Sequence, residues 1–129
     1  AITQGNMAFL NRQNFSFPPD HGARLVTMIL GDQTLRSLWS TELEQTRINM
    51  LNLRQKLEDE LRQCTNSDRF DFLATHRGMF SRLGVSVDTV EILRADFGIY
   101  MVGDSRINIA GLNSHTVPIL ARAVSQTIK

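Results

Sequence analysis

Apolar residues recur at three- and four-residue spacing along a stretch without glycine or proline, residues 32–64. This spacing predicts one continuous amphipathic helix, with Asp32 as its N-cap. At 1.5 Å per residue the helix would be about 45–50 Å long, which exceeds the diameter of so small a domain. Such a helix pairs in a coiled coil or packs on a second domain. Its apolar stripe comprises Leu35, Leu38, Trp39, Leu43, Met50, Leu53, Leu57 and Leu61.

Shorter elements are predicted on both sides of this helix. A helix should begin near Pro19 and end at Gly31, whereas the first fourteen residues show little pattern. Residues 70–75 and 76–84 each favour a short strand, and residues 99–111 favour a β-hairpin with its turn at 103–105. A further helix is expected after Ser86 as N-cap, with Gly98 as its C-terminal stop and a buried face of Val87, Val90, Leu93 and Phe97.

A last helix should follow Asn113 or Ser114, either of which can cap it, with Pro118 tolerated in its first turn. The order of elements predicts an α+β fold: a small antiparallel or mixed sheet, packed helices and one long inter-domain helix. Three parts are expected. They are a loop and helix at 1–31, the long helix at 32–64, and a small α+β domain at 65–129.

The charge balance and the cysteine count narrow the possible surroundings of the chain. Its 129 residues carry 14 Lys and Arg against 13 Asp and Glu, so there is no concentrated basic face and no nucleic-acid partner is expected. No apolar run approaches the ~18 residues of a membrane helix, and no membrane partner is expected either. The single Cys64 cannot form an internal disulfide, which favours a reducing, cytoplasmic location.

Metal and nucleotide sites are not indicated by any motif. His21, His76 and His115 are far apart, so no zinc site is expected. Glycine-rich phosphate loops and nucleophile elbows are absent from the sequence. The charged segments at 42–47 and 58–62 are interpreted as helix faces in contact with solvent.

Two arginines stand out as candidate binding residues. Arg106 lies in a predicted strand among isoleucines and alanine, between Gly103 and Gly111. It either points into water or receives an anion, and its planar guanidinium is suited to a carboxylate. Arg12 precedes an aromatic, proline-containing loop, a type of segment that commonly carries binding residues.

Four segments in order resemble the aspartate and aromatic amino acid aminotransferases. "NRQNFSFPPDHGARLV" (11–26) resembles their R-x-x-[YWF]-S-N-P-P-x-[HQ]-G-A segment. "RGMFSRLG" (77–84), "FGIYMV" (97–102) and "SRINIAGLN" (105–113) resemble three later segments of the same family. The long helix falls between these sets, where the family has its inter-domain helix. The resemblance covers nearly the whole chain from Met7, and "AGLNS" (110–114) leans toward the bacterial aromatic branch.

The resemblance implies a fold-type I, pyridoxal-phosphate-dependent, homodimeric enzyme that exchanges amino groups between aromatic amino acids or aspartate and 2-oxoglutarate. By the same resemblance, Arg106 grips the substrate α-carboxylate. Arg12 reaches the neighbouring subunit's site to bind a side-chain carboxylate, and Ser16 lies on the same active-site loop. The chain departs from the family pattern where Phe17 replaces Asn, where Arg82 replaces an aromatic, and where Asp104-Ser105 replaces Ser-Gly.

The cofactor-binding part of the family pattern is missing from these residues. Neither Lys56, on a charged helix face, nor the final Lys129 is a credible Schiff-base lysine, and the phosphate-binding glycine/serine segment is also lacking. The resemblance therefore implies a C-terminal fragment, inactive alone and without bound cofactor. The fragment is expected to self-associate through the stripe of Leu43, Met50, Leu53 and Leu57.

Two alternatives stay open. A stand-alone, non-enzymatic module could use the long helix as an interaction surface. A stand-alone carboxylate binder would need Arg12 and Arg106 to converge within one chain.

Overall fold

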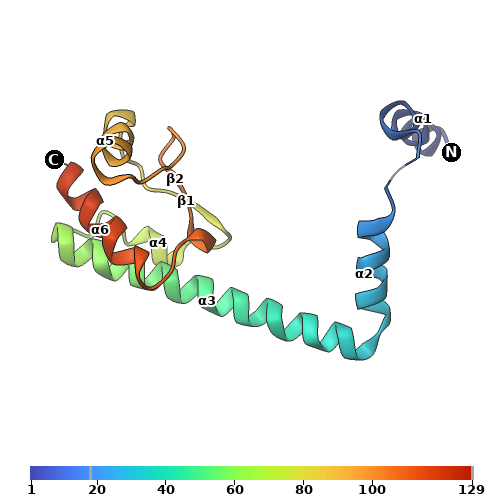
Figure 1. Cartoon of the computed structure of the whole chain (residues 1–129), viewed down its shortest axis with the longest axis horizontal. Helices are drawn as coiled ribbons and strands as arrows, with labels where there is room; N and C mark the ends of the chain where they lie inside the picture. Colours follow the sequence, from blue (N-terminus) through green and yellow to red (C-terminus); the bar gives the residue numbers. More distant parts are fainter. Residues whose placement is uncertain (18, 129) are drawn as a thin grey trace. The chain divides into compact units, whose positions relative to one another are not determined.

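The computed structural model describes residues 1–17 and 19–128, and Figure 1 shows the chain. Two compact units are formed by residues 1–44 and 45–129, and the long helix α3 (Gln33–Thr65) contributes to both. Asp32 caps this helix as predicted, since its Oδ1 accepts hydrogen bonds from the amides of Thr34 (2.8 Å) and Leu35 (2.9 Å). The domain boundaries at 31/32 and 64/65 stay a prediction.

The first unit contains α1 (Ile2–Phe15), α2 (His21–Gly31) and the beginning of α3. Neither α1 nor α2 has a buried residue. The helix at α1 was not anticipated, because its residues lack an apolar stripe. Helix α2 begins at His21, two residues after Pro19, near which the sequence predicts its start.

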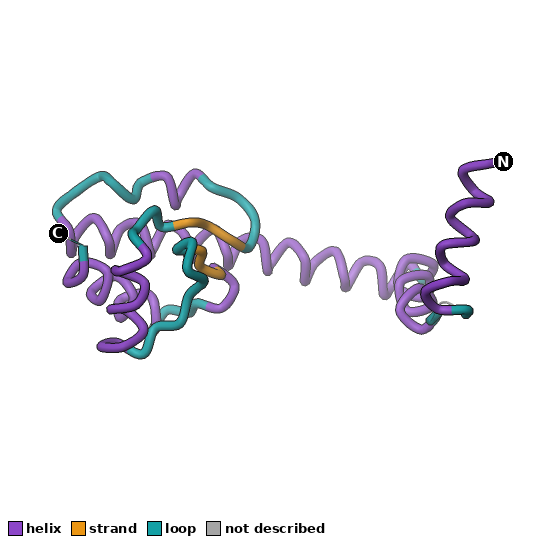
Figure 2. Tube along the Cα trace, turned by 90° about the horizontal axis from the view of Figure 1, so that it is seen from above, coloured by secondary structure: helices purple, strands orange, loops and turns teal. Residues whose placement is uncertain are grey.

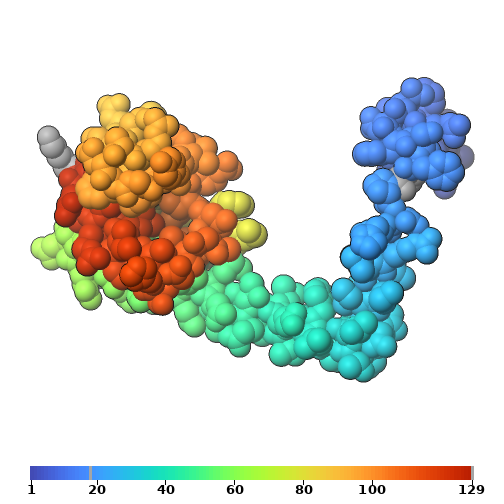
Figure 3. Space-filling model, in the orientation of Figure 1, coloured from blue at the N-terminus to red at the C-terminus, as the bar shows by residue number. Residues whose placement is uncertain are grey.

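The second unit has one apolar core to which the end of α3, the later helices and β2 contribute. Helices α5 (Val87–Phe97) and α6 (Thr116–Thr127) lie in contact, shown in orange and red in Figure 3. The core residues are Leu57, Leu61, Phe70, Leu73, Leu83, Leu93, Ile107, Ile109, Val117, Leu120, Ala121, Ala123 and Val124. Burial of this apolar surface is the main force that stabilises the unit.

The sheet consists of β1 (Phe80–Arg82) and β2 (Arg106–Asn108), which pair antiparallel. Figure 2 shows both strands in orange within the second unit. In each strand the central residue, Ser81 or Ile107, is buried and its two neighbours are exposed. The register joins Phe80 to Asn108 and Arg82 to Arg106, so these four side chains share the outer face of the ribbon.

Two strand predictions are wrong. Residues 70–75 form a turn and the short helix α4 (Phe72–Thr75), because Phe70 and Leu73 enter the core three residues apart, which is a helical spacing. The hairpin at 99–111 does not form, since β2 pairs with β1 instead of with residues 99–102. A turn does occur at 103–104, and the 3-10 helix η1 (Ile109–Gly111) ends the segment.

The predicted helix caps are confirmed. Ser86 Oγ accepts a hydrogen bond from the amide of Thr89, and Gly98 closes α5 in the left-handed conformation at φ 64°. Asn113 Oδ1 accepts from the amides of His115 and Thr116 at the start of α6 (2.9 Å each). Two assignments on α5 are wrong: Val87 is 61% exposed because it precedes the turn that meets the core, and Phe97 is 38% exposed at the end of the helix, where it lines a cavity.

Part of the predicted self-association stripe is already used inside the second unit. Leu57 is fully buried in the core and Leu53 packs against it, so these two side chains are not free to meet a second copy. Leu43 is exposed. The predicted dimer contact through Leu57 is therefore wrong, because the core takes the side chain that the contact needs.

None of the described helices is long and apolar enough to span a membrane.

Candidate functional site: a carboxylate receptor on the strand pair

Arg106 begins β2, and the alternation of the strand decides where its side chain goes. Ile107 turns into the core, so Arg106 and Asn108 face outward. The Arg106 guanidinium carbon lies 5.6 Å from the centre of the Phe80 ring on the paired strand. A cation stacked on an aromatic face at this distance is held in place without losing its charge. Arg106 forms no ion pair with any described residue.

A cavity of about 740 Å³ lies beside Arg106 in the second unit. Among the described residues that line it, Arg106 carries the only charge. The others are mainly apolar or aromatic and come from β1, the end of α5, the loop before β2, the segment after η1 and the start of α6. They include Phe80, Phe97, Ile99, Tyr100, Met101, Leu112 and Ile119. A single cation on an apolar wall suits an anion with an apolar body.

The backbone before Arg106 is held by its own short network. Ser105 is buried and adopts a left-handed conformation (φ 62°), which a residue other than glycine adopts at a cost. Its Oγ accepts a hydrogen bond from the amide of Gly84 (3.1 Å), and its carbonyl accepts from the amide of Leu83 (3.0 Å). These two bonds fix the entry of β2 and stabilise a left-handed backbone conformation that glycine adopts most readily.

Arg54 on α3 fixes the other strand. It is only 1% exposed, and its guanidinium donates hydrogen bonds to the carbonyls of Gly78 (2.7 Å), Phe80 (3.2 Å) and Leu73 (3.3 Å). A fourth bond reaches Ser81 Oγ at 2.7 Å. Burial, and secondarily the nearby Arg77, lower the pKa of Arg54 from its ordinary value.

Sequence reasoning missed Arg54 and misplaced Glu58, which is also buried. The buried positions of α3 are Arg54, Leu57, Glu58 and Leu61, which follow the i, i+3, i+4, i+7 pattern of one helix face. This spacing could have identified Arg54 and Glu58 as buried positions. The prediction followed the apolar stripe instead, which includes neighbouring positions of the helix. The interpretation of 58–62 as a solvent-facing segment is wrong for Glu58 and Leu61.

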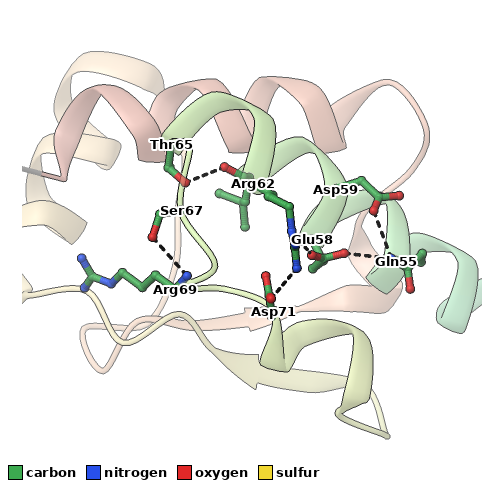
Figure 4. A network of polar contacts seen from close by, with 9 residues as sticks. Gln55, Glu58, Asp59, Arg62, Thr65, Ser67, Arg69 and Asp71 are labelled. Atoms are coloured by element: carbon green, nitrogen blue, oxygen red, sulfur yellow. Dashed lines mark hydrogen bonds and ion pairs between the residues drawn. The ribbon is translucent and has the colours of Figure 1, made fainter.

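Glu58 lies in the polar network of Figure 4. It accepts hydrogen bonds from Gln55 (2.8 Å) and from Arg62 (2.9 Å), and Arg62 also binds Asp71. Burial raises the pKa of Glu58 from its ordinary value of 4.5. The neighbouring Asp59 and Asp71 also raise this pKa, and Arg62 opposes the rise.

We expect Glu58→Gln to change how stability depends on pH. Because its pKa is higher in the folded state, Glu58 favours folding fully below about pH 4.5, and this contribution is lost as the pH rises through the raised pKa. As the pH rises from 4 to 7, the midpoint temperature of thermal unfolding of the wild type should therefore decline relative to that of Glu58→Gln. Glu60→Gln, on the same helix, is the control, and equal pH profiles for wild type and Glu58→Gln would refute the expectation.

Arg12 and Ser16 lie in the first unit, and Arg106 lies in the second. Arg12 belongs to the last turn of α1, not to a loop, and is exposed. Ser16 ends that helix with φ 58°, and its amide donates to the carbonyl of Arg12 (3.1 Å). Convergence of the two arginines is not tested, and the roles of all three residues stay predictions.

The described residues do not fit a pyridoxal phosphate site. Lys56 Nζ donates a hydrogen bond to the carbonyl of Ser114 at 2.9 Å, and it does not line the cavity beside Arg106. Lys129 lies outside the described residues. Within the described part of the chain, no group of three or more His, Cys, Asp and Glu is placed to hold a metal ion.

The chain is similar to known aminotransferases over nearly its whole length. Residues 5–124 match the family model "Aminotransferase class I and II". The chain is 59% identical over 123 residues to the aromatic-amino-acid aminotransferase of Paracoccus denitrificans, which covers 95% of this chain and 31% of that protein. The chain thus spans about a third of the length of this relative.

Solved structures give the same relationship. An aromatic amino acid aminotransferase with 3-indolepropionic acid matches with a TM-score of 0.92 and 58% identity, over 97% of this chain and 32% of that one. The aromatic-amino-acid aminotransferase of Burkholderia pseudomallei, covalently bound to pyridoxal phosphate, matches with a TM-score of 0.85 and 36% identity, over 92% and 30%. The predicted α+β fold is confirmed, and the chain belongs to the class I and II aminotransferase family.

Proposed function

We propose that the chain is the substrate-binding C-terminal third of an aminotransferase that acts on aromatic amino acids. The observation that carries the proposal is that Arg106 is the single charged residue among the described residues that line a mainly apolar cavity. A carboxylate would take the guanidinium fork, and an apolar side chain would take the cavity wall. The similarity to aminotransferases that act on aromatic amino acids supports the same choice.

Pyridoxal phosphate would supply the electron sink for amino-group transfer in the whole enzyme. Because the described residues do not fit it, its lysine and phosphate-binding residues are assigned to chain outside these 129 residues. This chain contributes binding and orientation: Arg106 fixes the α-carboxylate, and Phe80 holds the guanidinium in place. The proposed amino-group acceptor is 2-oxoglutarate.

The whole enzyme is proposed to be a homodimer. Arg12 and Ser16 are assigned to the neighbouring subunit's site, with Arg12 as the receptor for the side-chain carboxylate of an acidic substrate or of 2-oxoglutarate. The exposure of Arg12 is consistent with a role outside its own unit. In this proposal Arg106 alone binds an aromatic substrate. Arg106 and Arg12 together bind an acidic substrate or 2-oxoglutarate.

The test is the intact mass and activity of the native polypeptide that carries these residues. We expect a mass of roughly three times 14.6 kDa, because the chain spans 31% of its Paracoccus relative. We also expect amino transfer from phenylalanine or tyrosine to 2-oxoglutarate. The 129-residue chain alone should be inactive. A native mass of 14.6 kDa, or transfer by the isolated chain, would contradict the proposal.

A further inference from the structure

The strand pair places two arginines directly opposite each other. Arg82 on β1 is the register partner of Arg106 on β2, so both side chains stand on the outer face of the ribbon. Like charges in this position repel, and each would compete for the same anion. Arg82 is 67% exposed in its side chain and is not among the residues that line the cavity, whereas Arg106 lines it.

Asp104 separates the two cations. Its Oδ2 accepts hydrogen bonds from Arg82 Nη2 (2.9 Å) and Nε (3.1 Å), which holds the Arg82 guanidinium by two of its donors. Its Oδ1 accepts from the backbone amide of Arg106 at 3.1 Å. Asp104 therefore hydrogen-bonds the side chain of Arg82, whereas it binds Arg106 only through the main-chain amide and acts on the Arg106 guanidinium through its charge alone.

The titration of Asp104 agrees with this arrangement. Partial burial alone would raise the pKa of its carboxyl. The hydrogen bonds from Arg82 and from the Arg106 amide outweigh burial, so the pKa lies below its ordinary value. Asp104 is therefore charged at neutral pH, and Arg82 is neutralised as a pair.

We propose that the Arg82–Asp104 pair is a specificity device that neutralises Arg82, leaves Arg106 as the one cation without an ion pair among the described residues of this face, and thereby favours monocarboxylates over dicarboxylates. The inference rests on the proposed function, because it assumes that Arg106 binds the carboxylate. It also explains two departures from the family pattern together: arginine replaces an aromatic at position 82, and aspartate replaces serine at position 104. Each charge is tolerated beside the site because the other is present.

Asp104→Asn tests the device with little other change. The asparagine Oδ1 can still accept the hydrogen bond from the Arg106 amide, but the negative charge is gone. Arg82 would then be free to meet a second carboxylate. Arg82→Gln and the double variant complete the cycle, and Arg122→Gln on the exposed side of α6 is the control.

The measurement is binding of 3-phenylpropionate and of succinate by calorimetry, made on the full-length native protein and its variants. We expect Asp104→Asn to raise the succinate-to-phenylpropionate affinity ratio about threefold to fivefold, the effect of one surface charge pair. The double variant should return the ratio to that of the wild type, because Arg82 causes the gain. In 1 M salt the gain should disappear.

The outcomes separate the two proposals. An unchanged ratio in Asp104→Asn, or a gain that persists in the double variant, overturns the specificity device even if the protein transfers amino groups. The expected ratios in a protein that binds carboxylates but transfers no amino group support the device and refute the proposed activity. Failure of the wild type to bind either carboxylate overturns both.

Discussion

Arg106→Leu in the full-length protein is expected to lower kcat/KM for every amino-acid substrate by about 100-fold to 1000-fold. Removing one partner of a desolvated charge pair costs about 2–5 kcal/mol, and every amino acid presents the same α-carboxylate. The leucine keeps the apolar wall of the cavity, so the loss reports the charge and its fork. Steady-state kinetics with phenylalanine and aspartate measure it.

Two companion variants make this result specific. Arg106→Lys keeps a positive charge without the planar fork, so an intermediate loss is expected. Arg122→Leu removes an exposed arginine of α6 and should leave kcat/KM unchanged. The thermal midpoint of Arg106→Leu should stay near that of the wild type, because the Arg106 side chain is exposed and forms no ion pair with the described residues. Unaltered kinetics in Arg106→Leu would refute the assignment.

Arg54→Met should be the most destabilising single change in the second unit, at about 3–5 kcal/mol in the free energy of unfolding. The methionine fills much of the volume, but three backbone carbonyls and Ser81 Oγ lose their donor in a buried position. Urea unfolding of the protein measures the loss. Arg122→Met is the matched control, with an expected change within about 0.5 kcal/mol.

Arg54→Lys distinguishes charge from geometry at this position. An ammonium group has three donors on one atom and cannot reach four acceptors that lie around a planar fork, so most of the loss should remain. Stability of Arg54→Met equal to that of Arg122→Met would show that the four hydrogen bonds contribute little.

The elements that sequence reasoning predicted correctly are those with local signals. Helix α3 has an unbroken apolar repeat and an aspartate cap, and α5 is bounded by Ser86 and Gly98. The β1–β2 pairing joins segments far apart in the chain, and no local pattern distinguishes it from the hairpin expected at 99–111. Residues 70–75 are short enough for either period to fit, and the core decides between them.

The residues of the candidate site likewise differ in whether the local sequence predicts them. Arg106 was identified because a charged residue within an apolar strand and a family motif coincide there. Arg54 was missed because charged residues are almost never fully buried unless paired, and its partners come from distant residues. Glu58 was missed although its partners Gln55 and Arg62 lie on the same helix, because its burial depends on the face that α3 turns to the core. The ion pair of Arg82 with Asp104 depends on the strand register, which the sequence pattern does not specify.

The four bonds of Arg54 have a mechanical consequence. Two of them, to Phe80 and Ser81, fasten the second half of α3 to β1, and the other two hold the carbonyls of Leu73 and Gly78 before this strand. Strand β1 is paired along its length with β2, which begins at Arg106. Helix α3, the Arg54 guanidinium and the β1–β2 pair thus form a rigid connection. Any tilt of α3 would move Arg106 with it. The force that acts on Arg106 when it binds a carboxylate would therefore be transmitted to α3.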